Sequence, residues 1–393
     1  MFGTKEKIKS NRYRRYITYI MGFILSISAA LPAYIQSSLL KQYINLEAIS
    51  LLFVASNIIT AVMIGFFPKV IKKLGNYFTT KAVMITYGTA LLGLVATNSV
   101  VIIIISFLLF IISSNLLWIN IDILLEDASS DGKTGIIRTL YLTLNNLGWI
   151  SAPMISAYLV NVGGYTLPFL ISAALVFPVF AILIAKRKNL NVSKKYKKEN
   201  LVKSFKKLWA NPNLKGVFIV ATLLNLFYSC AVLYVPIYLN QNLGIDWREL
   251  GWMFAVMLLP FSLFELPAGY LADKYLGEKE IMSLGLFIIF ISLILFFLIK
   301  VPTPWIWAAA LFLSRVGAAL VDSMRDTYFF KNVNSKEVGF INIFRMTGPL
   351  GYIIGTATAS FFLIFFPINY LFLIFAAIMI PGFYYIALIK DTK

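Results

Sequence analysis

The chain has 393 residues, of which 60% are hydrophobic and only 13% charged, and its formal net charge is +18. No water-soluble fold of this size can bury so much apolar surface, since an average soluble domain is only about half apolar, and the composition therefore predicts a membrane protein. A single cysteine and the absence of histidine exclude a disulfide framework, a cysteine-rich metal site and an imidazole proton carrier.

Apolar runs long enough to cross a bilayer recur from one end of the chain to the other. A helix rises about 1.5 Å per residue, so about 20 apolar residues span a hydrocarbon layer of about 30 Å. The runs must be helical, because lipid offers the backbone no hydrogen-bond partner and they are too long for barrel strands. In chain order we predict twelve crossings, at 16–39, 48–67, 82–97, 100–125, 135–160, 166–185, 216–239, 249–271, 281–300, 305–324, 338–366 and 370–388.

The basic residues sort to one side of these crossings. With the N-terminus in the cytoplasm, the exceptions are Lys41, Arg248 and Lys300 on the outer side and Arg315 within a crossing. This asymmetry follows the positive-inside rule. It predicts a multi-pass protein of the plasma (inner) membrane with both termini cytoplasmic, and it leaves the positive charge no need of a nucleic-acid partner.

A long basic stretch divides the chain into three expected parts: an N-terminal six-helix bundle (1–185), a cytoplasmic linker (186–215) and a C-terminal six-helix bundle (216–393). Within the linker, Leu201, Phe205 and Leu208 recur at helical spacing with lysines between them. This pattern fits an amphipathic helix on the inner leaflet. A plain solvated linker is the alternative.

A faint internal repeat relates the two halves. A shift of 204 positions aligns three pairs at equivalent places in the crossing pattern: Gly65 with Gly269, Asp122 with Asp326, and Gly135 with Gly339. Two six-helix halves joined by a long basic loop are typical of transporters whose halves rock about a central site. We therefore expect an all-α polytopic fold of twelve helices in two pseudo-symmetric bundles.

The clearest match to a known family lies between the eighth and ninth crossings, in the segment Gly269-Tyr270-Leu271-Ala272-Asp273-Lys274-Tyr275-Leu276-Gly277-Glu278-Lys279. It resembles the loop signature of the major facilitator superfamily, with one extra residue before the second glycine. Gly269 would allow close helix approach and Gly277 a tight turn, while Asp273 can accept hydrogen bonds from a helix N-terminus or a cation. The resemblance implies the major facilitator fold and a gate containing these three residues, with Arg345 as a plausible partner of Asp273.

Two other segments depart from the patterns of that family. In the first half, Gly65 is followed by Phe66, Phe67, Pro68 and Lys69, so lysine stands where the signature has aspartate. The segment from Gly148 to Ala157 is similar to a degraded form of the glycine-proline signature of the family's antiporters. It favours the drug/proton antiporter branch or an uncharacterised one, although small residues there would equally serve helix packing.

Arg315 is the outstanding candidate for substrate binding. The tenth crossing places it about 15 Å from the outer end, near the bilayer midplane, where an ionisable side chain needs a partner or a function. The resemblance implies that crossings one, four, seven and ten line a central cavity. We therefore expect Arg315 to lie exposed in a polar pocket and to bind an anionic or carbonyl-bearing substrate, the alternative being a structural ion pair within the second half.

Glu265, in the eighth crossing, is the most deeply placed acid. A buried carboxylate can pick up and release a proton as access alternates, so Glu265 is the candidate for proton coupling. A permanent ion pair with Arg315 or Arg345 is the alternative.

Four further charges lie near the inner ends of crossings four, five and ten. Asp322 and Asp326 share a helical face with Arg315, and Asp122 closes the fourth crossing with Arg138 opposite. We expect them to form gate pairs rather than a substrate site.

Uncharged polar side chains complete the candidate substrate site. In a hydrocarbon environment they point toward protein or water rather than lipid, and the candidates are Asn115, Trp118, Asn225, Tyr228 and Gln36. The sequence contains no metal-ligand cluster, phosphate-cradling loop or nucleophile motif. We therefore expect no catalytic residues, no metal, no cofactor and no ATP-driven pumping by this chain.

These features predict a secondary transporter that moves a small organic solute by alternating access, with proton-coupled efflux as the leading mode. Its partners would be the solute, protons and the lipid bilayer, and the chain would act as a monomer. An uncoupled facilitator, or an importer of a sugar, organic acid or lipid, is the alternative. A membrane-embedded enzyme or scaffold is disfavoured, because isolated charges are spread over both halves instead of gathering at one centre.

Overall fold

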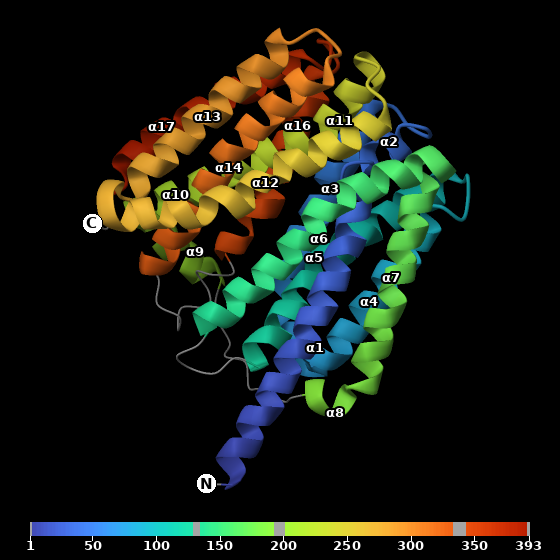
Figure 1. Ribbon diagram of the computed structural model, residues 1–393, viewed down its shortest axis with the longest axis vertical. Helices are drawn as coiled ribbons and strands as arrows, with labels where there is room; N and C mark the ends of the chain where they lie inside the picture. Colours follow the sequence, from blue (N-terminus) through green and yellow to red (C-terminus); the bar gives the residue numbers. More distant parts are fainter. Residues whose placement is uncertain (1, 129–133, 192–200, 333–342, 391–393) are drawn as a thin grey trace. The chain divides into compact units, whose positions relative to one another are not determined.

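The computed structural model describes residues 2–128, 134–191, 201–332 and 343–390 (Figure 1). Over these residues the secondary structure is helical, without a β-strand. The helices are α1 (Phe2–Ala33), α2 (Gln36–Leu40), α3 (Leu46–Leu74), α4 (Asn76–Gly93), α5 (Val100–Ala128), α6 (Thr134–Gly163), α7 (Thr166–Ala185), α8 (Arg187–Leu190), α9 (Leu201–Ala210), α10 (Pro212–Ser229), α11 (Val235–Ile237), α12 (Trp247–Leu271), α13 (Glu278–Leu298), α14 (Pro304–Asn332), α16 (Thr347–Phe362) and α17 (Tyr370–Leu388). The all-α class that the composition predicts is confirmed.

Nine helical segments in the described part of the chain are long and apolar enough to cross a membrane, judged by length and composition. They contain α1, α3, α5, α7, α10, α12, α13, α14 and α17. The three other predicted crossings overlap α4, α6 and α16, and residues 338–342 of the eleventh lie outside the described part of the chain. The chain is thus a multi-pass membrane protein, and the count of twelve crossings stays a prediction.

Two predicted helix boundaries are wrong near the N-terminus. The first crossing does not run to residue 39, because α1 ends at Ala33, directly after Pro32, whose ring crowds the preceding turn and which has no N–H to donate. The third crossing begins earlier than predicted, at Asn76. Its polar first turns are helical because hydroxyls such as that of Thr80 donate back to the helix backbone, here to the Asn76 oxygen at 2.7 Å.

The seventh crossing is not the single regular helix that the sequence predicts. After α10, a π-helical turn at Cys230–Tyr234 leads into α11, and a second π-helical turn follows at Tyr238–Asn242. Pro236 lies between the two turns and cannot donate to the helix ladder, so a wider turn accommodates the missing bond. This segment is therefore an irregular C-terminal extension of α10.

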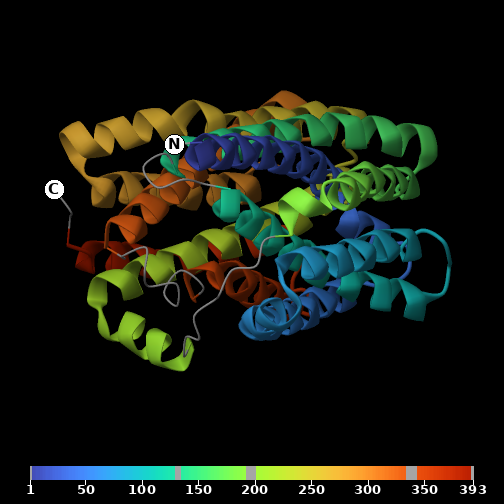
Figure 2. The same ribbon diagram turned by 90° about the horizontal axis from the view of Figure 1, so that it is seen from below.

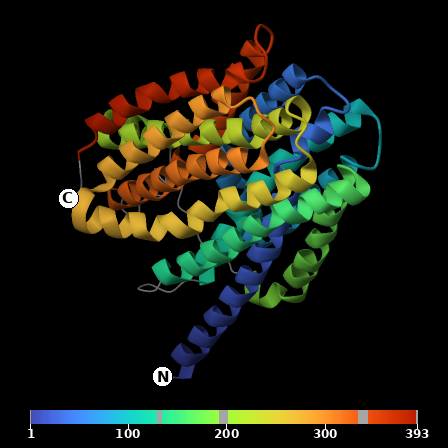
Figure 3. The same ribbon diagram turned by 45° about the horizontal axis from the view of Figure 1, so that its top comes forward.

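The chain folds into two compact units, one of residues Met1–Leu39 and Val62–Lys197, the other of Leu40–Ala61 and Lys198–Lys393. In the first unit α1 packs against α6 and α7, and α4 against α5 (Figure 2). In the second, α14 packs against α12 and α13, and α10 against α16 (Figure 3). The first half of α3 therefore belongs to the same compact unit as α10 to α17.

The internal repeat is visible in the helix bounds. Both α5 and α14 have 29 residues, and α14 starts and ends 204 positions after α5. Gly75 and Gly277 have positive φ values of 81° and 92° and directly precede α4 and α13. Side chains other than that of glycine are strained at such angles. Gly277 thus makes the tight turn that the sequence predicts, and Gly75 makes its counterpart.

Candidate functional site

Arg315 lies on α14 in the second unit and is only 1% exposed. Its guanidinium carbon is 5.2 Å from the centre of the Phe227 ring and 5.6 Å from that of Tyr228, both on α10. Cation-π attraction of a desolvated guanidinium contributes about 2 kcal/mol. The expectation that Arg315 lies exposed in a pocket is therefore wrong for this conformation, because aromatic rings of α10 pack over the charge.

Two nitrogens of this guanidinium, Nε and Nη1, are buried and have no hydrogen-bond partner among the described residues. Nor does any carboxylate in that part of the chain form an ion pair with Arg315, so the structural ion pair considered as the alternative is not formed here. An unpaired charged donor inside a protein costs about 1–3 kcal/mol or more. The guanidinium therefore keeps two donors, Nε and Nη1, without a hydrogen-bond acceptor among the described residues.

Arg325, on the same helix, is held by ionic partners instead. It forms an ion pair with Asp322 through Nη2, and its Nε lies 3.5 Å from Oδ1 of Asp326. Its Nη1 donates to the backbone oxygen of Ala221 on α10 at 3.3 Å. The two acids predicted at the inner gate thus share Arg325 as a cationic partner. Arg325 is not among the predicted gate residues, although its three-residue spacing from Asp322 is typical of an ion pair on a helix.

Glu265 lies on α12 and is partly buried. Within the described chain it forms no ion pair, so a permanent pair with Arg315 or Arg345 is not present in this conformation. Asp322 and Asp326 of α14 lie within electrostatic range of its carboxylate. Its part in proton coupling stays a prediction.

Asn225 and Tyr228 lie on α10, so the structure brings three predicted substrate residues together in one unit, Arg315 being the third. Asn225 donates from Nδ2 to the Ala221 backbone oxygen at 2.8 Å. Gly351 of α16 packs directly on it, since a Cβ added there would lie 2.5 Å from Cβ of Asn225. Close packing of α16 thus fixes α10 at the level of Asn225.

The other predicted substrate residues lie in the first unit. Asn115 donates from Nδ2 to the Ile111 backbone oxygen at 2.9 Å, and Trp118 lies partly buried about one turn further along α5. Gln36, at the start of α2, is buried and donates to the Ala33 backbone oxygen at 3.0 Å. These amides are engaged with the backbone of their own segments, and their part in substrate binding stays a prediction.

The predicted gate residues are only partly covered by the structure. The side chains of Asp273 and Arg138 lie outside the described residues, while Arg345 is exposed and Asp122 partly buried. Gly269 does not make the expected close helix approach, because a Cβ added there would meet no atom within 4 Å. In this conformation Gly269 adjoins open space.

Comparison with known proteins decides the family. The model of the Major Facilitator Superfamily matches residues 16–249 and 217–393. The chain belongs to the major facilitator superfamily. The predicted fold class is thereby confirmed, as is the prediction of a transporter rather than an enzyme.

Solved structures of this fold cover nearly the whole chain. The nucleoside transporter NupG is 16% identical, with a TM-score of 0.72 over 95% of this chain and 98% of its own. A bacterial homologue of the iron transporter ferroportin, in its inward-facing state, is 13% identical, with a TM-score of 0.73 over 95% and 98%. The peptide transporter POT in complex with sulfate is 11% identical, with a TM-score of 0.76 over 95% and 93%. No curated protein matches in sequence.

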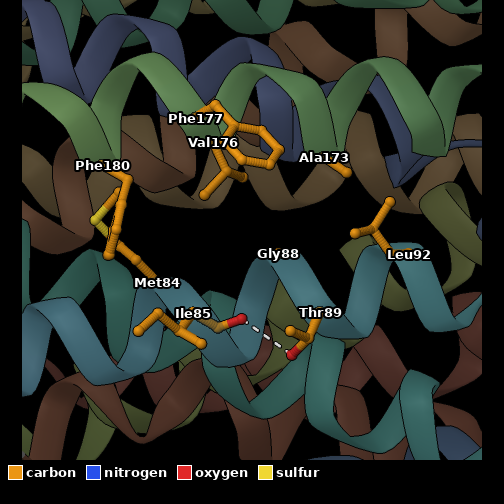
Figure 4. A pocket seen from close by; sticks show the side chains of 9 residues that line it. All are labelled: Met84, Ile85, Gly88, Thr89, Leu92, Ala173, Val176, Phe177 and Phe180. Carbon is orange, nitrogen blue, oxygen red and sulfur yellow. Dashed lines mark hydrogen bonds between the residues drawn. The ribbon is translucent and has the colours of Figure 1, made fainter.

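An apolar groove of about 180 Å³ lies between α4 and α7 of this transporter (Figure 4). Its lining consists of Met84, Ile85, Gly88, Thr89, Leu92, Ala173, Val176, Phe177 and Phe180. The Thr89 hydroxyl donates to the Ile85 backbone oxygen at 3.0 Å, so it is engaged with its own helix (Figure 4). Because its lining is almost wholly apolar, the groove is unsuited to the polar part of a solute and fits a hydrocarbon chain.

A buried contact between α3 and the seventh crossing escapes the sequence analysis. The hydroxyls of Ser50 and Tyr234 lie 2.6 Å apart, inside the second unit. Lys41 hydrogen-bonds to Gln241 in the same unit. These residues belong to the predicted outer ends of their crossings. No local pattern marks such a pair, because its members are far apart in the sequence.

Proposed function

We propose that this transporter exports a small organic solute in exchange for protons by alternating access. The observation that carries the proposal is the buried guanidinium of Arg315, with two unpaired nitrogens in the described structure, on the helix next to that of Glu265. Ionisable groups inside a membrane are costly, so those that are retained without partners mark substrate or proton pathways. On this basis Arg315 binds the solute and Glu265 carries the proton.

Access to Arg315 requires α10 to move, because Phe227 and Tyr228 pack over the guanidinium. The π-helical turn Cys230–Tyr234 follows these residues directly. Such turns are frequent at functional sites. We assign this turn the role of a hinge: in one state the rings cover Arg315, and in the other they admit a carboxylate or carbonyl oxygen to Nε and Nη1.

The outer ends of α3 and the seventh crossing would form the closed gate in this conformation. The hydrogen bond between Ser50 and Tyr234 holds them together. At the predicted inner end, the Asp322 and Asp326 network on Arg325 would be part of the second gate, together with the signature loop around Asp273. Opening the two gates in turn is the alternating-access cycle of transporters with repeated halves.

The direction of transport is inferred from the sixth helix, α6. The segment from Gly148 to Ala157 resembles an antiporter signature, which favours efflux. A Cβ added at Gly148 would collide with Ser26 of α1, and Ser156 donates to the Leu31 backbone oxygen at 2.8 Å. These contacts support the packing role of the segment as well. The proposal places the protein as a monomer in the plasma membrane with cytoplasmic termini.

Transport by the purified protein in proteoliposomes tests this function. Uptake of radiolabelled benzoate, uridine and ethidium, which are an anion, a neutral nucleoside and a cation, is measured with and without a pH gradient. We expect transport of the anion or the carbonyl-bearing nucleoside, accelerated by the gradient. Arg315→Ala should lower it by about tenfold or more, since a hydrogen bond to a charged group contributes about 1.5–3 kcal/mol.

Glu265→Gln separates coupling from binding. The amide keeps the shape of the side chain but cannot exchange a proton, so the variant should retain solute exchange without a gradient and lose the acceleration by the gradient. Arg248→Gln, which removes an exposed charge near the start of α12, is the matched control and should behave as the native chain. A native rate that ignores the pH gradient would establish the uncoupled facilitator, and full transport by Arg315→Ala would overturn the assigned site.

A further inference from the structure

Helix α9 carries two exposed aromatic side chains that pack on each other. Phe205 is 41% and Trp209 44% exposed, and their rings stack with centres 5.6 Å apart. Each ring also contacts the buried Phe218 of α10 edge-on, at 6.3 and 6.4 Å. The pair is thus anchored on α10 while part of each ring stays uncovered. Large amphipathic or apolar rings in such a position favour the boundary between water and lipid.

Three lysines lie near the aromatic pair in the sequence, and one of them contacts a ring of the pair. Lys206 and Lys207 are exposed on α9, and Nζ of Lys215 lies 4.9 Å from the centre of the Trp209 ring. The sequence from residue 201 to residue 215 contains no aspartate or glutamate, so no acid of the segment itself neutralises these charges. We call the five residues Phe205, Lys206, Lys207, Trp209 and Lys215 the α9 patch.

The α9 patch is fixed at the end of a membrane-spanning helix. Leu208, between Lys207 and Trp209 on α9, is fully buried. Asn211 caps α10, its Oδ1 accepting from the backbone nitrogens of Asn213 at 3.0 Å and Leu214 at 3.3 Å, and Pro212 occupies the first turn. Figure 2 shows the sharp turn that joins the two helices. The patch thus lies at the start of a segment long and apolar enough to cross a membrane, Pro212–Asn242, and lipid headgroups border the ends of such a span.

We propose that the α9 patch binds the phosphate group of anionic phospholipids in the cytoplasmic leaflet. The lysines provide positive charge for the phosphodiester, and the uncovered rings fit against the upper part of the acyl chains. A dissolved acidic ligand would complement the lysines but would leave both rings in water. The charge and the rings together therefore favour a lipid over a soluble partner.

The structure also differs from the sequence pattern in which residues of α9 are exposed. The sequence pattern assigns Leu201, Phe205 and Leu208 to the apolar face of α9. In the structure Leu208 packs into the protein, and Trp209 is exposed beside Phe205 instead. The lipid site is thus built from one aromatic stack and flanking lysines, and it is separate from Arg315 and independent of the transported solute.

Lipid binding to the full-length protein tests this proposal without any transport assay. Native mass spectrometry of the purified protein, titrated with phosphatidylglycerol or phosphatidylcholine, gives an apparent Kd for each lipid. We expect tighter binding of phosphatidylglycerol, weakened about tenfold or more when Lys206, Lys207 and Lys215 are all changed to glutamine. Lys300→Gln is the control, because Lys300 lies over a ring, Phe297, at 4.4 Å but at the opposite predicted side.

Two further measurements decide the identity of the ligand. Trp209→Phe should retain phosphatidylglycerol binding and Trp209→Ser should lose most of it, with an unchanged circular dichroism spectrum in both variants. Inorganic phosphate should not displace the lipid at equal concentration. Equal affinity for the two lipids, unchanged binding in the triple-lysine variant, or displacement by inorganic phosphate would overturn the assignment.

Discussion

Arg315 and Arg325 lie on the same helix, α14, and both are largely buried, with 1% of the first residue and 14% of the second side chain exposed. Arg325 is held by two carboxylates and a backbone oxygen, whereas Arg315 has only aromatic rings as charge partners within the described structure. Burial is therefore common to both arginines, and the identity of the partners separates them. The comparison teaches that an unpaired charge, and not burial itself, points to the site of function.

Removing the two arginines should change the free energy of unfolding in opposite directions. Removing one partner of a buried ion pair leaves the other charge uncompensated, which destabilises a protein by about 3–5 kcal/mol. Removing a buried charge that has no ionic partner relieves a desolvation cost instead. If Arg315 binds the solute as proposed, its unpaired charge lowers stability in the absence of that solute, as is common at functional sites.

Replacing each arginine with leucine tests this difference most directly. We expect Arg325→Leu to cause the largest loss in the free energy of unfolding. Asp322 would lose its cation, so the free energy of unfolding should fall by about 3 kcal/mol, the low end for buried pairs because the network is partly exposed. Arg315→Leu should keep or raise the free energy of unfolding while transport is lost. Denaturant unfolding in detergent, followed by circular dichroism, measures both variants. A similar loss in the two would show that Arg315 has a structural partner.

The sequence predicts the helices well where an apolar run is regular. The predicted crossings at 166–185 and 370–388 coincide with α7 and α17. The bounds are wrong at Pro32, where a helix ends inside an apolar run. Hydrophobicity records which residues favour lipid, but it carries little information on where the backbone hydrogen bonds are interrupted.

The sequence predicts Arg315, Asn225 and Tyr228 as site residues, but not the contact between the arginine and the aromatic rings. A charge inside an apolar run can be read directly, so Arg315 stands out in the sequence. Its cover by Phe227 and Tyr228 depends on how α10 is rotated against α14, which one sequence does not determine. Arg325 can be read from the sequence as well. Its positive charge is accounted for by the positive-inside pattern, so its pairing with Asp322 does not stand out.

The aromatic rings over Arg315 allow a second test of the difference between the two arginines, with a smaller expected change in free energy. A double-mutant cycle of Phe227→Leu with Arg315→Leu should yield a coupling energy of about 1–2 kcal/mol, the value expected for a desolvated cation-π contact. The same cycle with Arg325→Leu should yield a coupling near zero, because Arg325 lies over the ring of Phe344 instead, at 5.9 Å. Unfolding in detergent again provides the free energies. Equal coupling in the two cycles would mean that Phe227 acts through general packing of α10.

The smallest effect concerns a buried pair that carries no charge. Ser50 and Tyr234 are joined by one hydrogen bond of 2.6 Å, so their coupling in a cycle of Ser50→Ala with Tyr234→Phe should be about 1 kcal/mol. If this contact is the closed outer gate, its loss should raise the population of the outward-open state by about fivefold, since about 1 kcal/mol changes an equilibrium by that factor.

The population of the outward-open state can be measured by alkylation of a single cysteine in intact vesicles with a membrane-impermeant maleimide. The cysteine replaces Val54 of α3, after Cys230 has been replaced with serine. Ser56→Ala is the control, because the Ser56 hydroxyl donates within its own helix, to the Leu52 backbone oxygen. Faster alkylation in Tyr234→Phe but not in Ser56→Ala would show that the hydrogen bond between Ser50 and Tyr234 keeps the outer gate closed. Equal alkylation rates in the native chain and in Tyr234→Phe would show that this contact has a structural role only.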